Sequence, residues 1–76
     1  MQPRMTNHFI LRMHERGISI DDVKKCLRSP DGTKDAGDGK IEAHKVVDSG
    51  KTITVIYFKS AHDTKELVLV TAYYSL

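Results

Sequence analysis

The sequence predicts a single α+β domain over residues 1–76, with two N-terminal helices packed on a three- to four-stranded antiparallel sheet. Apolar residues recur at helical spacing before residue 30, and the chain after residue 33 is rich in β-branched and aromatic runs. Short turns separate those runs, which favours antiparallel pairing. A chain of this size buries only about 60% of its unfolded surface, so a surface cleft is expected rather than a deep cofactor pocket.

The first predicted helix begins at Thr6 or Asn7, either of which can cap its N-terminus, and ends at Gly17. Phe9 and Met13 are four residues apart, so they share the face that we expect to contact the sheet.

The second predicted helix has a clearer start, because Ser19 followed by Asp22 approximates a capping box. Val23 and Leu27 form its apolar face, and Pro30 ends it.

The chain after the second helix is predicted to form strands. Residues 1–5, which precede the first helix, are expected to be a loose lead-in. The expected strands are a short edge strand at Thr33–Asp35 and longer ones at Lys40–Val47, Thr52–Lys59 and Glu66–Tyr74. The longer two at the C-terminal end are apolar on both faces, which is typical of central strands.

Composition excludes several classes of protein. No apolar run approaches the roughly 20 residues of a membrane span, and the N-terminus lacks the apolar core of a secretory signal. The single cysteine, Cys26, suits a reducing cytosol, so we expect a cytoplasmic protein and no membrane partner. The four histidines lack the spacing of a zinc site, and no phosphate-binding glycine loop occurs, so neither a metal nor a cofactor is expected.

Charge is distributed unevenly along the chain. Residues 1–28 contain six Arg and Lys against three Asp and Glu, whereas residues 29–76 contain six Lys against seven acids. All arginines lie in the first part: Arg4, Arg12, Arg16 and Arg28. Because guanidinium groups bind phosphate in a bidentate manner, the helical part is the better candidate for an anion-binding surface.

His8, Arg12 and Arg16 form a polar row on the first helix, since residues four apart lie on one face. Cleavage of RNA without metal requires a proton-transfer group, and histidine can be that acid or base near neutral pH. Arginine stabilises the charge that develops on phosphate oxygens. From the strands, Thr71 and Tyr73 can supply hydroxyls or a base-stacking ring.

The same row is also typical of an ordinary solvated helix face. In that interpretation His8 caps or packs, and Arg12 and Arg16 are solvated or paired with Glu15. Both interpretations remain open at the level of residue types.

The chain resembles a small bacterial family of unknown function whose members begin with the pattern Thr-x-His-x3-Arg-Met-x2-Arg-Gly-Ile-Ser. The matching residues are Thr6, His8, Arg12, Met13, Arg16, Gly17, Ile18 and Ser19. A C-terminal strand of the type Val-x-Thr-x-Tyr corresponds to residues 69–73. This family is similar to the compact ribonuclease fold shared by barnase, EndoU, tRNA-cutting colicins and RelE-type toxins.

The resemblance implies a metal-independent endoribonuclease of toxin–antitoxin type that cleaves RNA by attack of the 2′-hydroxyl. It implies that His8, Arg16 and Thr71 carry the chemistry, and that Arg4, Arg12 and Tyr73 contact the RNA. The expected partners are RNA, an antitoxin protein and a second copy of the chain.

The alternative hypothesis is a non-catalytic module for protein interaction or dimerisation. Its binding surface would be the apolar sheet, in particular Tyr57, Phe58, Tyr73 and Tyr74.

Overall fold

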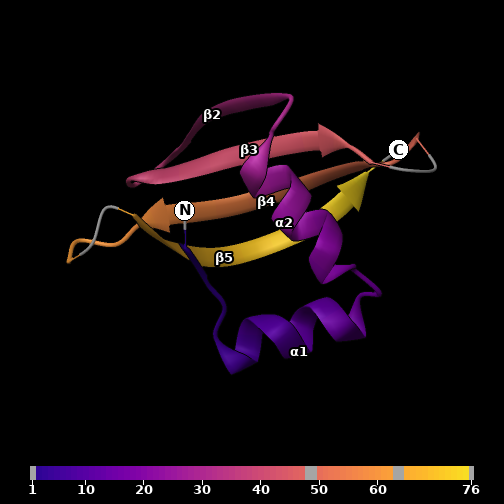
Figure 1. The fold of residues 1–76 in the computed structure, drawn as a ribbon, viewed down its shortest axis with the longest axis horizontal. Helices are drawn as coiled ribbons and strands as arrows, with labels where there is room; N and C mark the ends of the chain where they lie inside the picture. The colour runs from indigo at the N-terminus through magenta and orange to yellow at the C-terminus, as the bar shows by residue number, and fades with distance from the viewer. Residues whose placement is uncertain (1, 48–49, 63–64, 76) are drawn as a thin grey trace.

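The computed structural model describes residues 2–47, 50–62 and 65–75, and it confirms the α+β class. Helices and strands follow one another as β1 (Gln2–Arg4), α1 (Asn7–Glu15), α2 (Ile20–Arg28), β2 (Gly32–Gly37), β3 (Lys40–Val46), β4 (Thr52–Lys59) and β5 (Glu66–Ser75). The strands form one sheet in the order β1-β5-β4-β3-β2, and both helices lie on one side of it (Figure 1). Strands β2 to β5 pair antiparallel, as the sequence predicts.

The sheet has five strands, one more than the predicted maximum, because part of the expected lead-in is a strand. Gln2–Arg4 pairs in parallel with residues 66–68 of β5. Three residues are too few to show an alternating pattern, so no sequence signal identifies β1. Pro3 is compatible with this position, since an edge strand tolerates a residue without a backbone N–H.

Both helices begin at side-chain caps. Thr6, rather than Asn7, caps α1, because its hydroxyl accepts a hydrogen bond from the Phe9 backbone N–H at 3.1 Å. Ser19 caps α2 in the same way through the Asp22 N–H at 3.4 Å. Gly17, with a φ of 67°, makes the left-handed turn that lets the chain leave α1 toward α2. These caps fix where each helix begins on the sheet.

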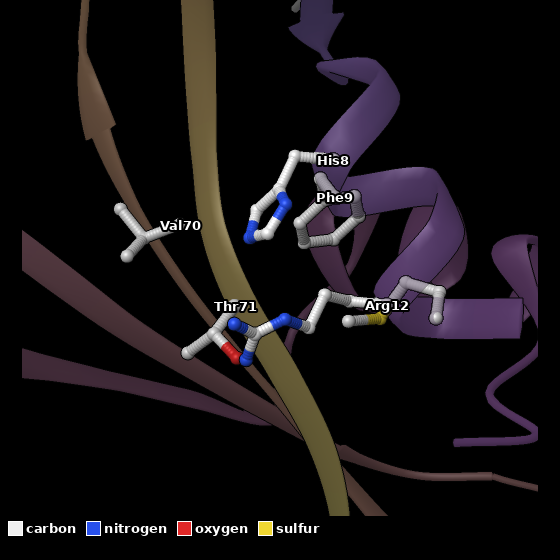
Figure 2. Close-up of a pocket in the computed structure, with 6 residues that line it drawn as sticks. His8, Phe9, Arg12, Val70 and Thr71 are labelled. Carbon is white, nitrogen blue, oxygen red and sulfur yellow. The ribbon is translucent and has the colours of Figure 1, made fainter. Parts of the chain in front are cut away.

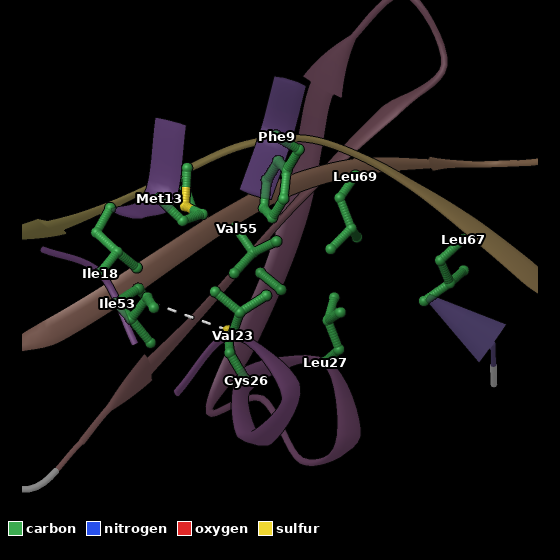
Figure 3. Packing of buried hydrophobic residues seen from close by; sticks show 12 residues of the cluster. Phe9, Met13, Ile18, Val23, Cys26, Leu27, Ile53, Val55, Leu67 and Leu69 are labelled. Carbon is green, nitrogen blue, oxygen red and sulfur yellow. Dashed lines mark hydrogen bonds between the residues drawn. The ribbon is translucent and has the colours of Figure 1, made fainter. Parts of the chain in front are cut away.

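The hydrophobic core lies between the two helices and the facing side of the sheet (Figure 3). Its largest fully buried side chains are Met13, Val23, Cys26, Ile53 and Val55. Helix α2 packs across β3 and β4, while α1 packs beside β5 (Figure 1). Among the residues that the structure describes, no helix is long and apolar enough to cross a membrane.

The opposite side of the sheet carries no helix, and we call it the open face. Val55 and Ala72 are paired and point into the core, so alternation places Ile56 and its partner Thr71 on the open face. The open face is formed chiefly by Val46, Thr54, Ile56, Phe58, Val70 and Tyr73. Helices therefore cover the apolar strands on one face only.

A register shift interrupts the pairing of β4 with β5. Tyr57 pairs with Leu69 and Ile56 pairs with Thr71, so Val70 is an extra residue with no partner on β4. Such a β-bulge bends the strand and changes the direction of its side chains. Val70 and Thr71 lie on the same side of β5 in Figure 2.

Candidate functional site

A pocket of about 190 Å³ lies between α1 and the bulge of β5. It is lined by His8, Phe9, Arg12, Met13, Val70 and Thr71 (Figure 2). His8 and Arg12 are four residues apart, as are Phe9 and Met13, so each pair lies along one side of α1 and the two sides are adjacent. Phe9 and Met13 are buried and anchor the helix, whereas His8 and Arg12 are exposed at its rim. The same periodicity thus builds both the core contact and the polar wall of the pocket.

The polar wall of this pocket is cationic. Among the described residues, the Arg12 side chain makes no hydrogen bond or ion pair, and no carboxylate lines the pocket. The imidazole of His8 and the guanidinium of Arg12 both extend toward β5, and the guanidinium lies beside the Thr71 side chain (Figure 2). Glu15 forms no ion pair with any described residue, so the pairing considered for it is absent there. Arg12 therefore has its donors available for a ligand.

Arg16 is placed differently from Arg12. Its Nη1 atom donates to Thr71 Oγ1 at 3.1 Å and to the backbone oxygen of Ala72 at 3.3 Å. Arg16 does not line the pocket, but it holds a hydroxyl that does. Because Thr71 Oγ1 accepts this hydrogen bond, its own O–H is left to donate to a bound group.

Two of the expected RNA contacts lie outside the pocket. Arg4 is on β1, where its Nη1 atom is 3.4 Å from Glu66 Oε1 in an exposed ion pair. Tyr73 is on the open face, two residues beyond Thr71, and 41% of it is exposed. The structure thus brings His8, Arg12 and Thr71 to one pocket, joins Arg16 to it through Thr71, and leaves Arg4 and Tyr73 apart from it.

Sequence reasoning did not identify Val70 as a site residue. Its place in the pocket depends on the β-bulge, and the bulge arises from the pairing of two strands rather than from a local pattern. Phe9 and Met13 were expected in the core alone, but each also forms part of the pocket. Phe9 directly follows His8 and Met13 directly follows Arg12 along α1, and this adjacency is the signal that could have indicated it.

Tyr74 also has a definite role that its residue type did not reveal. Its hydroxyl donates to Asp22 Oδ2 at 2.7 Å and accepts from the Ser19 N–H at 3.1 Å, so it joins the start of α2 to β5. Burial and the neighbouring Asp22 carboxylate raise the pKa of Tyr74, and the Ser19 N–H opposes that shift. Tyr74 is therefore engaged in holding the helix.

Metal binding and thiol chemistry find no support in the described residues. No three His, Cys, Asp or Glu side chains in that part of the chain are grouped so that they could hold a metal ion. Cys26 is buried in α2, and burial raises the pKa of its thiol from 9.0 to about 11. The thiolate required of a nucleophile is therefore disfavoured.

Comparison with known proteins gives one match. Residues 5–74 match the sequence profile of a domain of unknown function, DUF4258. Neither the curated proteins nor the solved structures include a significant match to this chain.

Proposed function

The chain belongs to the family DUF4258, and we propose that it is a metal-independent endoribonuclease whose site is the pocket between α1 and β5. One observation carries the proposal: an imidazole, a guanidinium without a partner among the described residues, and a threonine hydroxyl line a single pocket that no carboxylate enters. Such a set of groups suits a phosphodiester, which needs proton transfer and compensation of negative charge.

In the proposed reaction, His8 removes the proton from a ribose 2′-hydroxyl. The resulting oxygen attacks the adjacent phosphorus, and the bond from phosphorus to the 5′-oxygen breaks. The products are a 2′,3′-cyclic phosphate and a 5′-hydroxyl. Because the pocket is open to solvent and His8 is its one acid–base side chain among the described residues, water supplies the proton to the leaving oxygen.

The other polar groups stabilise the phosphorane. Arg12 donates to the phosphate oxygens that gain negative charge during attack. Thr71 donates its O–H to the same group, while Arg16 fixes the orientation of that hydroxyl from behind. We therefore assign Arg16 a positioning role.

The proposal extends to a toxin of the RelE type that acts on cytoplasmic RNA and is neutralised by an antitoxin. What supports this extension is the helix pair before an antiparallel sheet together with a cationic site that a protein of opposite charge can cover. Induced expression should stop growth, and co-expression of the neighbouring antitoxin gene should restore it. Growth unaffected by the wild-type protein at confirmed expression would remove the toxin assignment.

The direct test is incubation of RNA with purified protein in EDTA, with the ends of the fragments mapped. We expect cleavage with 2′,3′-cyclic phosphate ends, and a loss of at least about 100-fold in rate for His8→Ala, in line with removal of a general base. Arg12→Ala should lower the rate by a similar factor.

Two matched controls are available for this test. His14 is exposed on the same helix and Arg28 is exposed on α2, and neither lines the pocket, so His14→Ala and Arg28→Ala should retain the wild-type rate. Cleavage that persists at the wild-type rate in His8→Ala, or that EDTA abolishes, would show that the proposed site or mechanism is wrong.

A further inference from the structure

We propose that the open face is the interface of a homodimer, in which a second copy of the chain packs its own open face against the first. The inference concerns assembly and does not depend on the proposed ribonuclease activity, although the open face borders the pocket at Val70 and Thr71. It starts from the distribution of exposed apolar side chains over the described surface.

Exposed apolar residues are concentrated on this one face. Of the six large apolar side chains that are exposed among the described residues, four lie on the open face: Val46, Phe58, Val70 and Tyr73. The other two, Ile10 and Leu11, lie on α1. Exposed apolar side chains gathered on one face of a sheet are typical of an interaction site.

The side chains between these residues suit the packing of one sheet on another. Thr54 and Ile56 occupy the middle of the face and are β-branched, and Thr54 is only 6% exposed between its neighbours. His44 also remains close to the sheet, because it lies over Gly32, where an added Cβ would be 2.6 Å from His44 Cε1. Thr54 is paired with His44 on β3 and with Tyr73 on β5, and small side chains between larger ones let two sheets interdigitate at the spacing of about 10 Å seen in β-sandwiches.

Charge on the open face favours a protein of the same kind over a nucleic acid. Two ion pairs lie on it, Lys34 with Glu42 at 3.2 Å and Arg4 with Glu66 at 3.4 Å, and each is internally neutral. Lys40 lies on the same face by alternation along β3 and adds one cation, but so small an excess is not the dense positive charge that attracts a phosphate backbone. In an isologous dimer each partner presents the same surface, so the two ion pairs add no net charge to the interface.

The dimensions of the face are adequate for a dimer. Strand β4 has eight residues, which at about 3.3 Å each gives a length of roughly 26 Å. Four strands, β2 to β5, at about 4.8 Å spacing give a width of roughly 19 Å. The flat projection is thus roughly 500 Å², and the relief of the side chains raises the accessible area toward the roughly 800 Å² that each partner contributes to a standard interface.

The test is sedimentation equilibrium of the wild-type chain and of variants that place a charge on each apolar surface. We expect a dimer whose dissociation constant rises by at least about tenfold in Tyr73→Lys and in Phe58→Lys, because each substitution occurs twice in an isologous interface. Leu11→Lys is the matched control on α1, where 55% of the residue is exposed, and it should leave the dissociation constant unchanged.

A second measurement uses the wild-type protein alone, so it does not depend on the folding of any variant. Methyl resonances of Val46 and Val70 should shift as the protein concentration rises, whereas those of Leu11 should not. A wild-type chain that is monomeric up to millimolar concentration would overturn the proposal, as would dissociation by Leu11→Lys to the same extent as by Tyr73→Lys. A monomer whose Val46 resonances, which lie away from the pocket, respond to a single-stranded oligonucleotide would also overturn it, in favour of a nucleic-acid surface.

Discussion

The two faces of the sheet are built from the same strands but differ in what covers them. On β4, Ile53 and Val55 point toward the helices and are fully buried, while Phe58 points to the open face and is 37% exposed. Nothing in the residue types distinguishes the two sets, since both are β-branched or aromatic. The difference shows that the core of this small domain depends on one face alone, and that apolar residues on the other face are available for binding.

The largest expected difference in stability between the two faces is between substitutions of two phenylalanines. Phe9→Ala removes a buried ring from the core and should lower the free energy of unfolding by about 3–5 kcal/mol. Phe58→Ala removes a partly exposed ring from the open face and should cost less than about 1 kcal/mol at a concentration where the chain is monomeric. Urea denaturation of both variants measures the difference, and equal losses would mean that the open face belongs to the core.

A smaller effect separates two neighbouring tyrosines of β5. Tyr74→Phe deletes the hydroxyl that joins Ser19 and Asp22 to the strand, so it should lower the free energy of unfolding by about 1 kcal/mol. Tyr73→Phe changes an exposed side chain on the open face and should stay within about 0.5 kcal/mol of the wild type. The comparison fails if Tyr73→Phe is the more destabilised variant in the same urea titration.

The effect that is smallest at neutral pH is a pH dependence that belongs to the covered face and appears only in alkaline solution. Burial raises the pKa of the Cys26 thiol from 9.0 to about 11, so the folded state holds the proton more tightly than the unfolded state. The stabilisation is complete below pH 9.0 and is lost as the pH rises through about 11. Cys26→Ala should reduce this decline in urea titrations at alkaline pH.

Two tyrosines contribute a decline of the same sign, which the cysteine variant must retain. Burial raises the pKa values of Tyr57 and Tyr74 above 10.0, so their contribution to stability also falls at high pH. An unchanged pH dependence in Cys26→Ala would assign the whole decline to these hydroxyls.

Sequence patterns predicted the helices and four of the strands to within a few residues. Capping residues and apolar periodicity act locally, so Thr6 and Ser19 can be identified as helix caps without tertiary information. Strand β1 was not predicted, because three residues at an edge have no pattern of their own. The open face was predicted only in part: of the sheet residues named in the alternative hypothesis, Phe58 and Tyr73 lie on it, whereas Tyr57 and Tyr74 pack against the core. Apolar content does not say which side of a sheet two short helices cover.

The candidate site was predictable in part for the same reason. Helical spacing placed His8 and Arg12 together, and the strand pattern suggested Thr71. The contacts of Arg16 could not be predicted, because the distance from Arg16 to Thr71 depends on how α1 packs beside β5. Val70 depends on a bulge that the paired strands create jointly.

The hydrogen bond from Arg16 to the Ala72 backbone oxygen has a consequence for aggregation. Beyond residue 68, no strand of the described part of the chain pairs with the outer side of β5, and an unpaired edge is a template on which another chain can add a strand. A guanidinium on that carbonyl occupies one of the acceptors that such a strand would need. At the other end of the sheet, the β2 edge is interrupted by a register shift between Asp35 and Gly37. Both edges therefore oppose the edge-to-edge addition of strands that leads to fibres.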